Sequence, residues 1–364
     1  MPAGTVLSGA YALIIAPEWA ITILLEMRMK EAMFYRPGEE NKVNCFLCSH
    51  HCVIKPGKRG ICGVRENREG KLYSLVYGSL VAENVDPIEK KPLFHFLPGS
   101  RSYSIATVGC NFRCLHCQNY NISQYPHLFA GQISGTRRSP EEVIEEAQRS
   151  GCRSISYTYV EPTIFYEFAR DCSVLAHAAG IKNVFVSNGY MTPEVTRDLA
   201  PLLDGINIDV KAFTDDFYKK ICKARLQPVL DTVIMMHELG IWVEVTTLLI
   251  PGLNDEDAEL KNIARFIKSV DPGIPWHVTA FYPTYKLTDR SATPVATLRK
   301  ARDIGLDTGL KYVYEGNVPG LGGENTYCPS CGTEIISRYG FSIQNVSMDK
   351  GQCTQCGERI DGVW

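Results

Sequence analysis

The sequence of 364 residues has no strong charge bias and no long uninterrupted apolar run. Its formal net charge of −2 gives no general electrostatic basis for binding nucleic acid or a membrane surface, so we expect neither as a partner. The N-terminal stretch is apolar, but Pro17 and Glu18 interrupt it, and neither half reaches the roughly 20 residues of a bilayer span. Because no basic region precedes it, we expect residues 1–32 to be an apolar tail or the product of a start codon assigned too far upstream.

Cysteine, in contrast, is abundant, with fourteen residues. Eleven of them fall into three groups, at positions 45/48/52/62, 110/114/117 and 328/331/353/356. In a long chain without a clear secretory signal, such groups are typical of metal sites rather than disulfides. We therefore expect a reducing, cytoplasmic location, and we expect the other three thiols to be simply buried: Cys152, Cys172 and Cys222.

The stretch 104–120, SIATVGCNFRCLHCQNY, has C-x3-C-x2-C spacing at the end of an expected strand. Thiolates are the ligands of iron–sulfur clusters, and a [4Fe–4S] cube normally takes four of them. Only Cys110, Cys114 and Cys117 are close together, and no fourth cysteine follows in the short ferredoxin spacing. One iron then has an open position that the amino and carboxylate groups of S-adenosylmethionine (SAM) can chelate. A zinc knuckle is the competing interpretation, but zinc sites are usually closed by four ligands.

The N-terminal segment has C-x2-C-x3-C-x9-C spacing, with glycines that allow the chain to turn around a centre. Its four thiols can close a zinc site or hold an auxiliary cluster. Zinc is favoured, because it would stabilise a small segment that has little core of its own. The candidate ligands are Cys45, Cys48, Cys52 and Cys62.

The C-terminal segment contains two C-x2-C pairs separated by 21 residues, and a glycine follows each pair. This zinc-ribbon or rubredoxin-like pattern turns each pair tightly, so that all sulfurs face one tetrahedral metal. Spacing does not separate zinc from iron, although zinc suits a structural role. The candidate ligands are Cys328, Cys331, Cys353 and Cys356.

Strand-like and helix-like runs alternate between these two segments, which predicts right-handed crossovers and a parallel sheet. The expected strands are 104–109, 154–160, 183–189, 205–212, 242–250, 275–281 and 311–316, and the expected helices are 139–149, 163–178, 192–202, 227–239, 255–270 and 293–306. Six or seven units fall short of eight, so we predict an α/β fold with a partial (β/α)6 TIM-like barrel, open on one side.

The predicted organisation has small four-cysteine metal modules at both ends of this barrel. The modules occupy residues 40–75 and 321–364, the barrel occupies 76–320, and 81–100 is a linking stretch. Parallel barrels carry their reactive groups where strands end. The polar residues on the expected strands or at their ends are Glu161, Ser187, Asn188, Asp209, Lys211 and His277.

The three-cysteine loop resembles the signature of the radical SAM superfamily, in which a reduced [4Fe–4S] cluster cleaves SAM to methionine and a 5′-deoxyadenosyl radical. The motifs from about residue 76 to 316 are similar to those of its activating-enzyme branch, which includes the pyruvate formate-lyase activating enzyme. That branch has Gly-Gly-Glu-Pro where this chain has Tyr159-Val160-Glu161-Pro162. The similarity implies the following SAM contacts: Glu161 with the amino group, Ser187 and Asn188 with the ribose and methionine side, Lys211 beside Asp209 with the carboxylate, and His277 nearby.

From about residue 30 onward, the chain resembles the AmmeMemoRadiSam system radical SAM enzyme, through DPIEKKPLFHF, TVGCNFRCLHCQN, YTYVEPTIF, DVKAF, LLIPGLND, PWHVTAFYP and YVYEGNVPG. The resemblance implies a one-electron donor such as a ferredoxin or flavodoxin, and hydrogen abstraction from a substrate in the barrel mouth. An open barrel side suits a protein or peptide substrate, as for glycyl-radical activating enzymes, although a small molecule stays open. The competing classes are an electron-transfer iron–sulfur protein and a zinc-dependent nucleic-acid-binding module.

Overall fold

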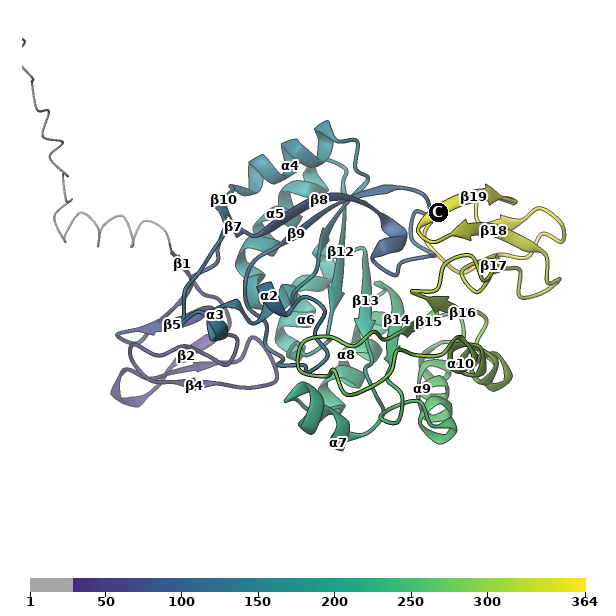
Figure 1. The fold of residues 1–364 in the computed structure, drawn as a ribbon. Coiled ribbons are helices and arrows are strands. Elements are labelled where there is room, and N and C mark those ends of the chain that lie inside the picture. The colour runs from purple at the N-terminus through teal and green to yellow at the C-terminus, as the bar shows by residue number, and fades with distance from the viewer. Residues whose placement is uncertain (1–28) are drawn as a thin grey trace, which may run out of the picture.

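The computed structural model describes residues 29–364 (Figure 1). The predicted tail therefore lies outside the described residues, except for its last four, of which two form β1 (Lys30–Glu31). Within 29–364, no helix is both long and apolar enough to cross a bilayer.

An eight-stranded sheet forms the centre of the molecule, in the order β16-β15-β14-β13-β12-β11-β9-β8. All neighbouring strands are parallel except β8, which pairs antiparallel with β9. The strands are β8 (Ala82–Pro87), β9 (Arg101–Ala106), β11 (Ser154–Tyr157), β12 (Lys182–Ser187), β13 (Gly205–Asp209), β14 (Trp242–Leu249), β15 (Trp276–Ala280) and β16 (Val313–Gly316). The two outer strands do not pair with each other, which confirms a partial barrel.

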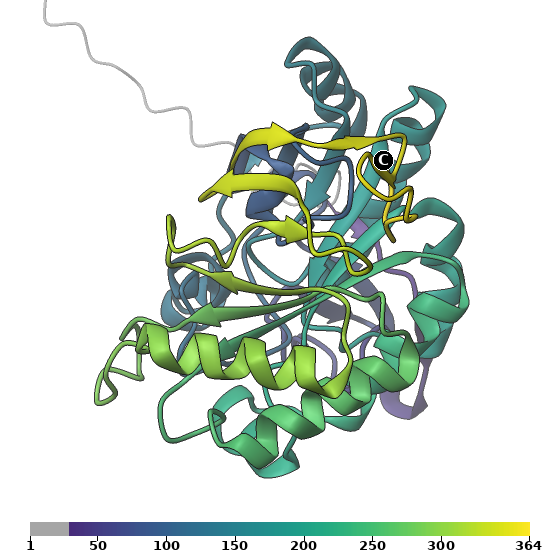
Figure 2. The same cartoon turned by 90° about the vertical axis from the view of Figure 1, so that its right-hand side faces the viewer.

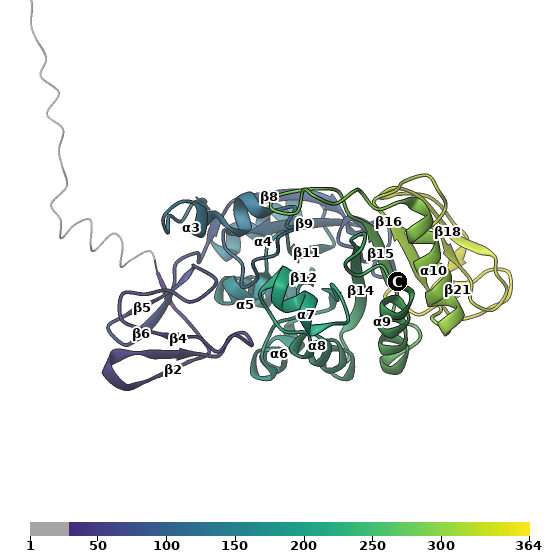
Figure 3. The same cartoon turned by 60° about the horizontal axis from the view of Figure 1, so that its bottom comes forward.

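Six helices connect the parallel strands and cover the outer face of the curved sheet (Figure 3). They are α4 (Pro140–Arg149), α5 (Tyr166–Ala178), α6 (Pro193–Leu199), α8 (Gln227–Glu238), α9 (Asp257–Val270) and α10 (Val295–Thr308). The first has the predicted capping box, in which Ser139 Oγ accepts from the Glu142 amide at 3.3 Å and the Glu142 carboxylate accepts from the Ser139 amide at 2.7 Å. Its apolar face, including Val143 and Ala147, is buried against the sheet and α5.

The interpretation of 81–100 as a linking stretch was wrong for its first half. Residues 82–87 form β8, which pairs along its whole length with β9 at the edge of the sheet. The sequence AENVDP lacks the apolar alternation of a strand, because β8 is an edge strand whose middle residues are exposed. Pro87 is tolerated there because it ends the strand.

The N-terminal module begins before the predicted residue 40, because its two small antiparallel sheets, β2-β3-β4 and β1-β6-β5, include strands at 30–31 and 35–37. Its strands are β2 (Tyr35–Pro37), β3 (Val43–Cys45), β4 (Val53–Ile54), β5 (Arg65–Arg68) and β6 (Lys71–Ser74). A buried ion pair attaches it to the barrel, since Arg65 Nη1 lies 3.1 Å from Glu167 Oε1 on α5. The same carboxylate accepts from the Met33 amide at 2.7 Å.

The C-terminal module lies beside β16, with α10 on the other side of that strand (Figures 1 and 2). It consists of β17 (Thr326–Tyr327), β18 (Glu334–Tyr339), β19 (Ser342–Val346), β20 (Met348–Asp349) and β21 (Gln352–Cys353). Its attachment to the barrel is polar and buried. The Arg338 guanidinium donates to Phe94 O at 2.9 Å, and the Val363 amide donates to His95 O at 2.7 Å.

A buried ion pair holds β8 in place. Asp86 Oδ2 accepts from Lys91 Nζ at 2.6 Å, and Asp86 Oδ1 accepts from Lys90 Nζ at 2.9 Å. Burial lowers the pKa of Lys91 to about 8, although Asp86 opposes that shift. Burial alone would raise the pKa of Asp86, but hydrogen bonds from Lys91, Tyr159 and Lys90 hold it well below its usual value.

We expect Asp86→Asn to lower the free energy of unfolding by about 3–5 kcal/mol, because it leaves the Lys91 cation buried without its counter-ion. Denaturant unfolding measures this loss. Lys90→Met is the matched control, since that partner is half exposed and its removal should cost less than about 1 kcal/mol. Equal stability of the Asp86→Asn variant and the wild type would contradict a structural role for the pair.

Candidate active site

The cluster loop, residues 107–119, follows β9 and carries the three predicted cluster ligands. It begins against the N-terminal module. Gly109 has φ 101°, and a Cβ on it would lie 2.5 Å from Val64 Cγ1 and 3.0 Å from Cys62 O, so only glycine fits. His50 Nε2 also lies 2.8 Å from Asn111 O. The loop is therefore positioned from both the barrel and the N-terminal module.

The three thiols of the cluster loop have different surroundings. Cys110 Sγ accepts from the Phe112 amide at 3.4 Å, and Cys117 Sγ lies 3.2 Å from Ser123 Oγ. Burial raises the pKa of Cys110 and that of Cys117. A hydrogen bond from the Cys222 thiol lowers the pKa of Cys114. Cys114, the buried one of the three, is therefore the thiol most favoured as a thiolate, the form that binds metal.

The three thiols of the cluster loop are not among the compact groups that would hold a single ion. A tetrahedral ion with metal–sulfur bonds of about 2.3 Å needs sulfurs about 3.8 Å apart. Among residues 29–364, only the C-terminal cysteines have all their ligand atoms within 4.8 Å of one another. Cys110, Cys114 and Cys117 do not meet that limit as a set, and a donor set of three thiols suits iron–sulfur chemistry.

Glu161 lies at the end of β11 and is almost fully buried. Its Oε1 accepts from the Thr163 amide at 3.1 Å, from Thr163 Oγ1 at 2.5 Å and from Ser187 Oγ at 2.8 Å. Its Oε2 accepts from the Asn188 amide at 2.7 Å. Burial raises the pKa of Glu161, while these four donors favour the carboxylate. The side chain thus ties together the ends of β11 and β12.

Asn188 extends this network to the cluster loop. Its Nδ2 donates to Asn111 Oδ1 at 2.8 Å, and its Oδ1 accepts from the Tyr190 amide at 3.1 Å. Asn111 directly follows the first cluster cysteine, Cys110. The structure therefore brings three of the expected SAM-binding residues to the cluster loop, namely Glu161, Ser187 and Asn188.

Lys211 follows β13 and lies 2.9 Å from Asp209 Oδ2. Burial alone would lower the pKa of Lys211, but Asp209 and the thiols of Cys114 and Cys222 raise it well above its usual value. The lysine is therefore a fixed cation close to Cys114. Asn254 Nδ2 donates to Lys211 O at 2.7 Å and holds its backbone.

The cluster loop contains two buried polar atoms without a hydrogen-bond partner, Asn111 Nδ2 and His116 Nδ1. Burial lowers the pKa of His116 to about 3, so its ring is neutral. Buried polar atoms are normally paired, and each unpaired one calls for an explanation such as a bound group. Together with the Lys211 cation, these atoms provide polar partners for a ligand such as SAM.

His277 lies apart from this group. Its Nε2 is 2.6 Å from Glu244 Oε2, and its ring packs against Phe94 and Tyr314 at 4.8 and 5.2 Å between centroids. Glu244 also accepts from the amides of Phe94 and His95. The structure thus connects His277 with the attachment of the C-terminal module, and it shows no contact to the other five expected SAM-binding residues.

The C-terminal cysteines form a compact site. Cys328 Sγ lies 3.6 Å from Cys356 Sγ, and Cys331 Sγ lies 3.8 Å from Cys353 Sγ. All four sulfurs lie within 4.8 Å of one another. These distances match the edge of about 3.8 Å expected for a tetrahedral ion with four thiolates, as in a structural zinc site.

The N-terminal cysteines are close but less compact. The charges of Cys45, Cys52 and Cys62 all act on the buried thiol of Cys48, yet the four do not meet the 4.8 Å limit that the C-terminal set meets. Burial raises the pKa of Cys62, which contacts the cluster loop through its carbonyl oxygen. Four thiols can close a zinc site or hold an auxiliary cluster.

Cys222 is a residue near the cluster that sequence reasoning missed. It ends the π-helical turn η5 (Tyr218–Cys222), and its carbonyl oxygen accepts from the Arg113 amide at 3.0 Å. Ile221 O accepts from the Leu115 amide at 3.0 Å, so η5 holds both sides of Cys114. A lone cysteine in KKICK gives no sequence signal, whereas π-helical turns often mark functional sites.

Tyr159 is a second missed residue. It has φ 62° at a position where the activating-enzyme branch has glycine, and a non-glycine residue needs support to keep that conformation. Its hydroxyl donates to Asp86 and accepts from Asn84, and Lys91 Nζ lies 4.6 Å from its ring centroid. Asn119 Nδ2 donates to Tyr159 O at 2.8 Å. Tyr159 thus links β8 to the end of the cluster loop.

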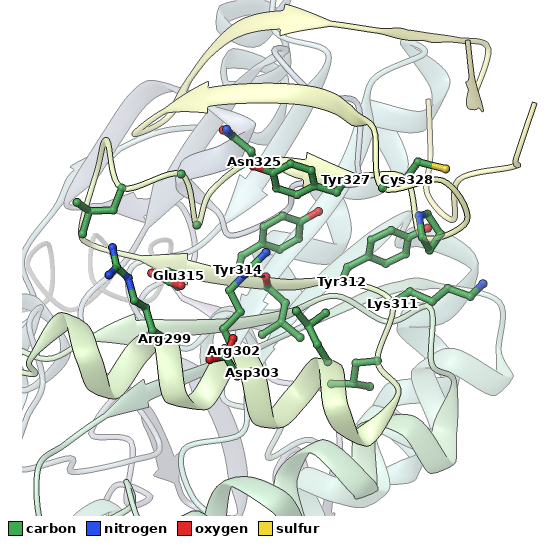
Figure 4. A pocket seen from close by; sticks show the side chains of 18 of the residues that line it. Arg299, Arg302, Asp303, Lys311, Tyr312, Tyr314, Glu315, Asn325, Tyr327 and Cys328 are labelled. Carbon is green, nitrogen blue, oxygen red and sulfur yellow. Dashed lines mark hydrogen bonds between the residues drawn. The ribbon is translucent and has the colours of Figure 1, made fainter. Parts of the chain in front are cut away.

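A groove of about 800 Å³ lies away from the cluster loop, between α10, β16 and β17 (Figure 4). Its wall carries charges of both signs, including Arg299, Arg302 and Asp303 from α10. Arg302 Nε is already bound to Val313 O at 3.2 Å. The residues expected to bind SAM do not line this groove.

The contact between Cys222 and Cys114 predicts an effect on the cluster's reduction potential, because hydrogen bonds to ligand sulfurs tune that potential. We expect Cys222→Ala to lower the midpoint potential, since the donor that stabilises the more negative reduced cluster is lost. Cys222→Ser keeps a donor and should stay near the wild-type value. A redox titration followed by EPR measures both. An unchanged potential in the alanine variant would contradict the contact.

The metal content of anaerobically reconstituted protein distinguishes the two four-cysteine sites. The compact C-terminal thiols suit one zinc, and an auxiliary cluster in the N-terminal module would bring the iron content to about eight per chain. Elemental and sulfide analysis of the wild type and of Cys48→Ala measures this, and the variant should lose about four irons. Roughly four irons and two zincs in the wild type would instead assign zinc to the N-terminal module.

Comparisons with known proteins agree with this arrangement. Residues 104–266 match the Radical SAM superfamily. The uncharacterized protein MJ0808 of Methanocaldococcus jannaschii is 50% identical over 338 residues, which cover 92% of this chain and all of that protein. The GTP 3′,8-cyclase of Aquifex aeolicus is 24% identical over 66% of this chain and 80% of its own length. The pyruvate formate-lyase-activating enzyme of Clostridium pasteurianum is 22% identical over 60% and 93%.

The superfamily match begins in β9, includes the cluster loop and the ends of β11, β12 and β13, and extends into α9. It therefore contains the three cluster cysteines and the network around Glu161 and Lys211. The partial barrel, its three-thiol loop and these similarities lead to one conclusion: the chain belongs to the radical SAM superfamily and is a radical SAM enzyme.

Proposed function

We propose that this enzyme produces a 5′-deoxyadenosyl radical from SAM and uses it to abstract hydrogen from a protein or peptide substrate, as the AmmeMemoRadiSam system radical SAM enzyme. The observation that carries this proposal is the chain of hydrogen bonds from Glu161 through Asn188 to Asn111. It supports a fixed relation between the cluster loop and the strand ends, where SAM would bind. The cluster supplies one electron to the sulfonium of SAM when both groups are bound.

The residues of the chain would bind the cluster, bind SAM and position the strand ends. Cys110, Cys114 and Cys117 hold the cluster, and Lys211 offers a cation to the SAM carboxylate. Asn111 and His116 offer polar atoms that have no partner within the protein. Glu161 uses both carboxylate oxygens within the protein, so we assign it to positioning Ser187 and Asn188 rather than to direct contact.

The similarities alone do not select a substrate class. One relative is a GTP cyclase and another is a pyruvate formate-lyase-activating enzyme, and their identities to this chain are nearly equal. The open barrel favours a protein or peptide, because the sheet does not close between its outer strands β8 and β16. A glycyl-radical or other activating role would use such a segment.

The proposed reaction needs a one-electron donor such as a ferredoxin or flavodoxin, and it needs a reducing compartment such as the cytoplasm. All fourteen cysteines are free of disulfides, which suits that compartment. A pure electron carrier would gain nothing from a cluster with an open iron. A zinc-dependent nucleic-acid-binding module would not need the barrel or the buried network at its strand ends.

Anaerobic turnover tests the proposal. We expect the reduced, reconstituted wild type to form 5′-deoxyadenosine and methionine from SAM, and Cys114→Ala to lose iron and this activity while its circular dichroism is retained. Cys152→Ala is the matched control, because that buried thiol lies outside all three cysteine groups. Iron retention with full turnover in Cys114→Ala would refute the site, and absence of turnover in the wild type would refute the function.

A further inference from the structure

A second cavity, of about 390 Å³, lies close to the cluster loop. It is lined by Gln118, which directly follows the cluster ligand Cys117. It is also lined by Gly340 and Phe341, in the hairpin between β18 and β19. The segment that follows β16 completes the wall. The cavity thus spans the space between the cluster loop and the C-terminal module.

Two buried carboxylates line this cavity, Glu315 at the end of β16 and Glu324 in the segment that leads to β17. They are only 5% and 4% exposed, and in each of them Oε2 is buried without a hydrogen-bond partner. Glu324 Oε1 is occupied, since it accepts from the Gly320 amide at 2.7 Å. A buried carboxylate oxygen without a donor is costly, so a ligand that supplies a donor would be stabilised here.

The rest of the lining is mostly apolar. Phe94, Tyr282 and Phe341 contribute aromatic surface, and the latter two are about half exposed. Tyr282 is held by its hydroxyl, which donates to Asn317 O at 3.2 Å. Aromatic faces attract cations and also pack against the aliphatic part of a lysine or arginine side chain.

The charged residues of the lining are all acidic, because it contains no lysine, arginine or histidine. Arginines near these carboxylates lie outside the lining, and the charges of Arg302 and Arg299 act on Glu315. Arg338 donates to Phe94 O and Thr326 Oγ1 and reaches Glu324 only at its backbone carbonyl. Arg299 and Arg302 line the separate groove in Figure 4, in which Glu315 forms a shared boundary.

We propose that this cavity binds the cationic side chain, lysine or arginine, of the peptide or protein substrate. The aliphatic part would pack between Phe341 and Tyr282, and the charged end would donate to the free oxygens of Glu315 and Glu324. A side chain bound there lies beside the residue that follows Cys117, so the neighbouring peptide backbone is brought to the open side of the barrel. This inference rests on the proposed function, because it names the substrate class for the same site.

The C-terminal four-thiolate site has a role in this arrangement. The hairpin that carries Phe341 is part of the module whose sulfurs stand 3.6 and 3.8 Å apart. A bound metal would fix that module, and through it one wall of the cavity. The module would then contribute to substrate binding although its metal is remote from the SAM chemistry.

The test uses a peptide probe on the reconstituted full-length protein without turnover. Calorimetric titration compares acetyl-Gly-Arg-Gly-amide with the same peptide carrying neutral citrulline, and with agmatine as a free cation. We expect the arginine peptide to bind at least about ten-fold more tightly than the citrulline peptide, because charged hydrogen bonds are lost in the latter. Stronger binding of agmatine than of the peptide would assign the cavity to a small cationic molecule and overturn the proposal.

Two variants and their controls make the result specific. Glu324→Gln should weaken arginine-peptide binding about ten-fold, whereas Asp349→Asn, the same charge change at an exposed position of the module, should not. If Glu324→Gln does not fold, Phe341→Ala serves instead, with Phe129→Ala as its control, because these two rings are 46% and 48% exposed. Unchanged affinity in the cavity variants would overturn the proposal.

The same samples separate this inference from the proposed function. The SAM-induced change in the EPR spectrum of the reduced cluster reports the radical SAM site, and it should be the same in the wild type and in Glu324→Gln. Peptide binding without a SAM response would leave the cavity valid and refute the proposed function. A SAM response with no preference for arginine over citrulline would support the proposed function and refute the cavity proposal.

Discussion

The buried carboxylate of Glu161 is the constraint on which the active-site geometry depends. It accepts four hydrogen bonds from the ends of β11 and β12, and Asn188, one of its partners, continues the network to Asn111 beside the first cluster cysteine. An unpaired carboxylate at this depth would be costly, so the strand ends can hardly separate without losing stability. The three-cysteine loop therefore does not depend on its own flexible backbone for position. It is fixed against a sheet edge, as a cofactor site requires.

Much of this arrangement could be predicted from the sequence. Strong β-then-α periodicity located all seven parallel strands and the six helices, and cysteine spacing located the cluster loop and the C-terminal thiols that the structure brings together. The failures have physical reasons. The edge strand β8 is polar and ends in proline, so it lacks a strand pattern. Cys222 reaches Cys114 only through a π-helical turn, and such a turn has no recognisable pattern in the local sequence. His277 does lie on a predicted strand, but its ring contacts Glu244 and not the other residues expected to bind SAM.

The two cysteine modules contact different parts of the barrel. The N-terminal module contacts the cluster loop directly, through Gly109 and Asn111. A second cluster there would lie on a short path for electrons. The C-terminal module contacts the last strand instead, through the buried Arg338, and its compact thiols suit a single structural ion. The N-terminal module thus borders the cluster loop, and the C-terminal module borders the last strand of the barrel.

Mössbauer spectroscopy of protein reconstituted with ⁵⁷Fe tests the central claim most directly, namely that the cluster held by Cys110, Cys114 and Cys117 has one iron without a protein ligand. Spectra recorded before and after addition of SAM would be compared. The account predicts that the signal of one iron per chain changes on SAM binding, while all other irons keep their parameters. If every iron keeps its parameters at saturating SAM, the three-thiol cluster is not the SAM site and the account is contradicted.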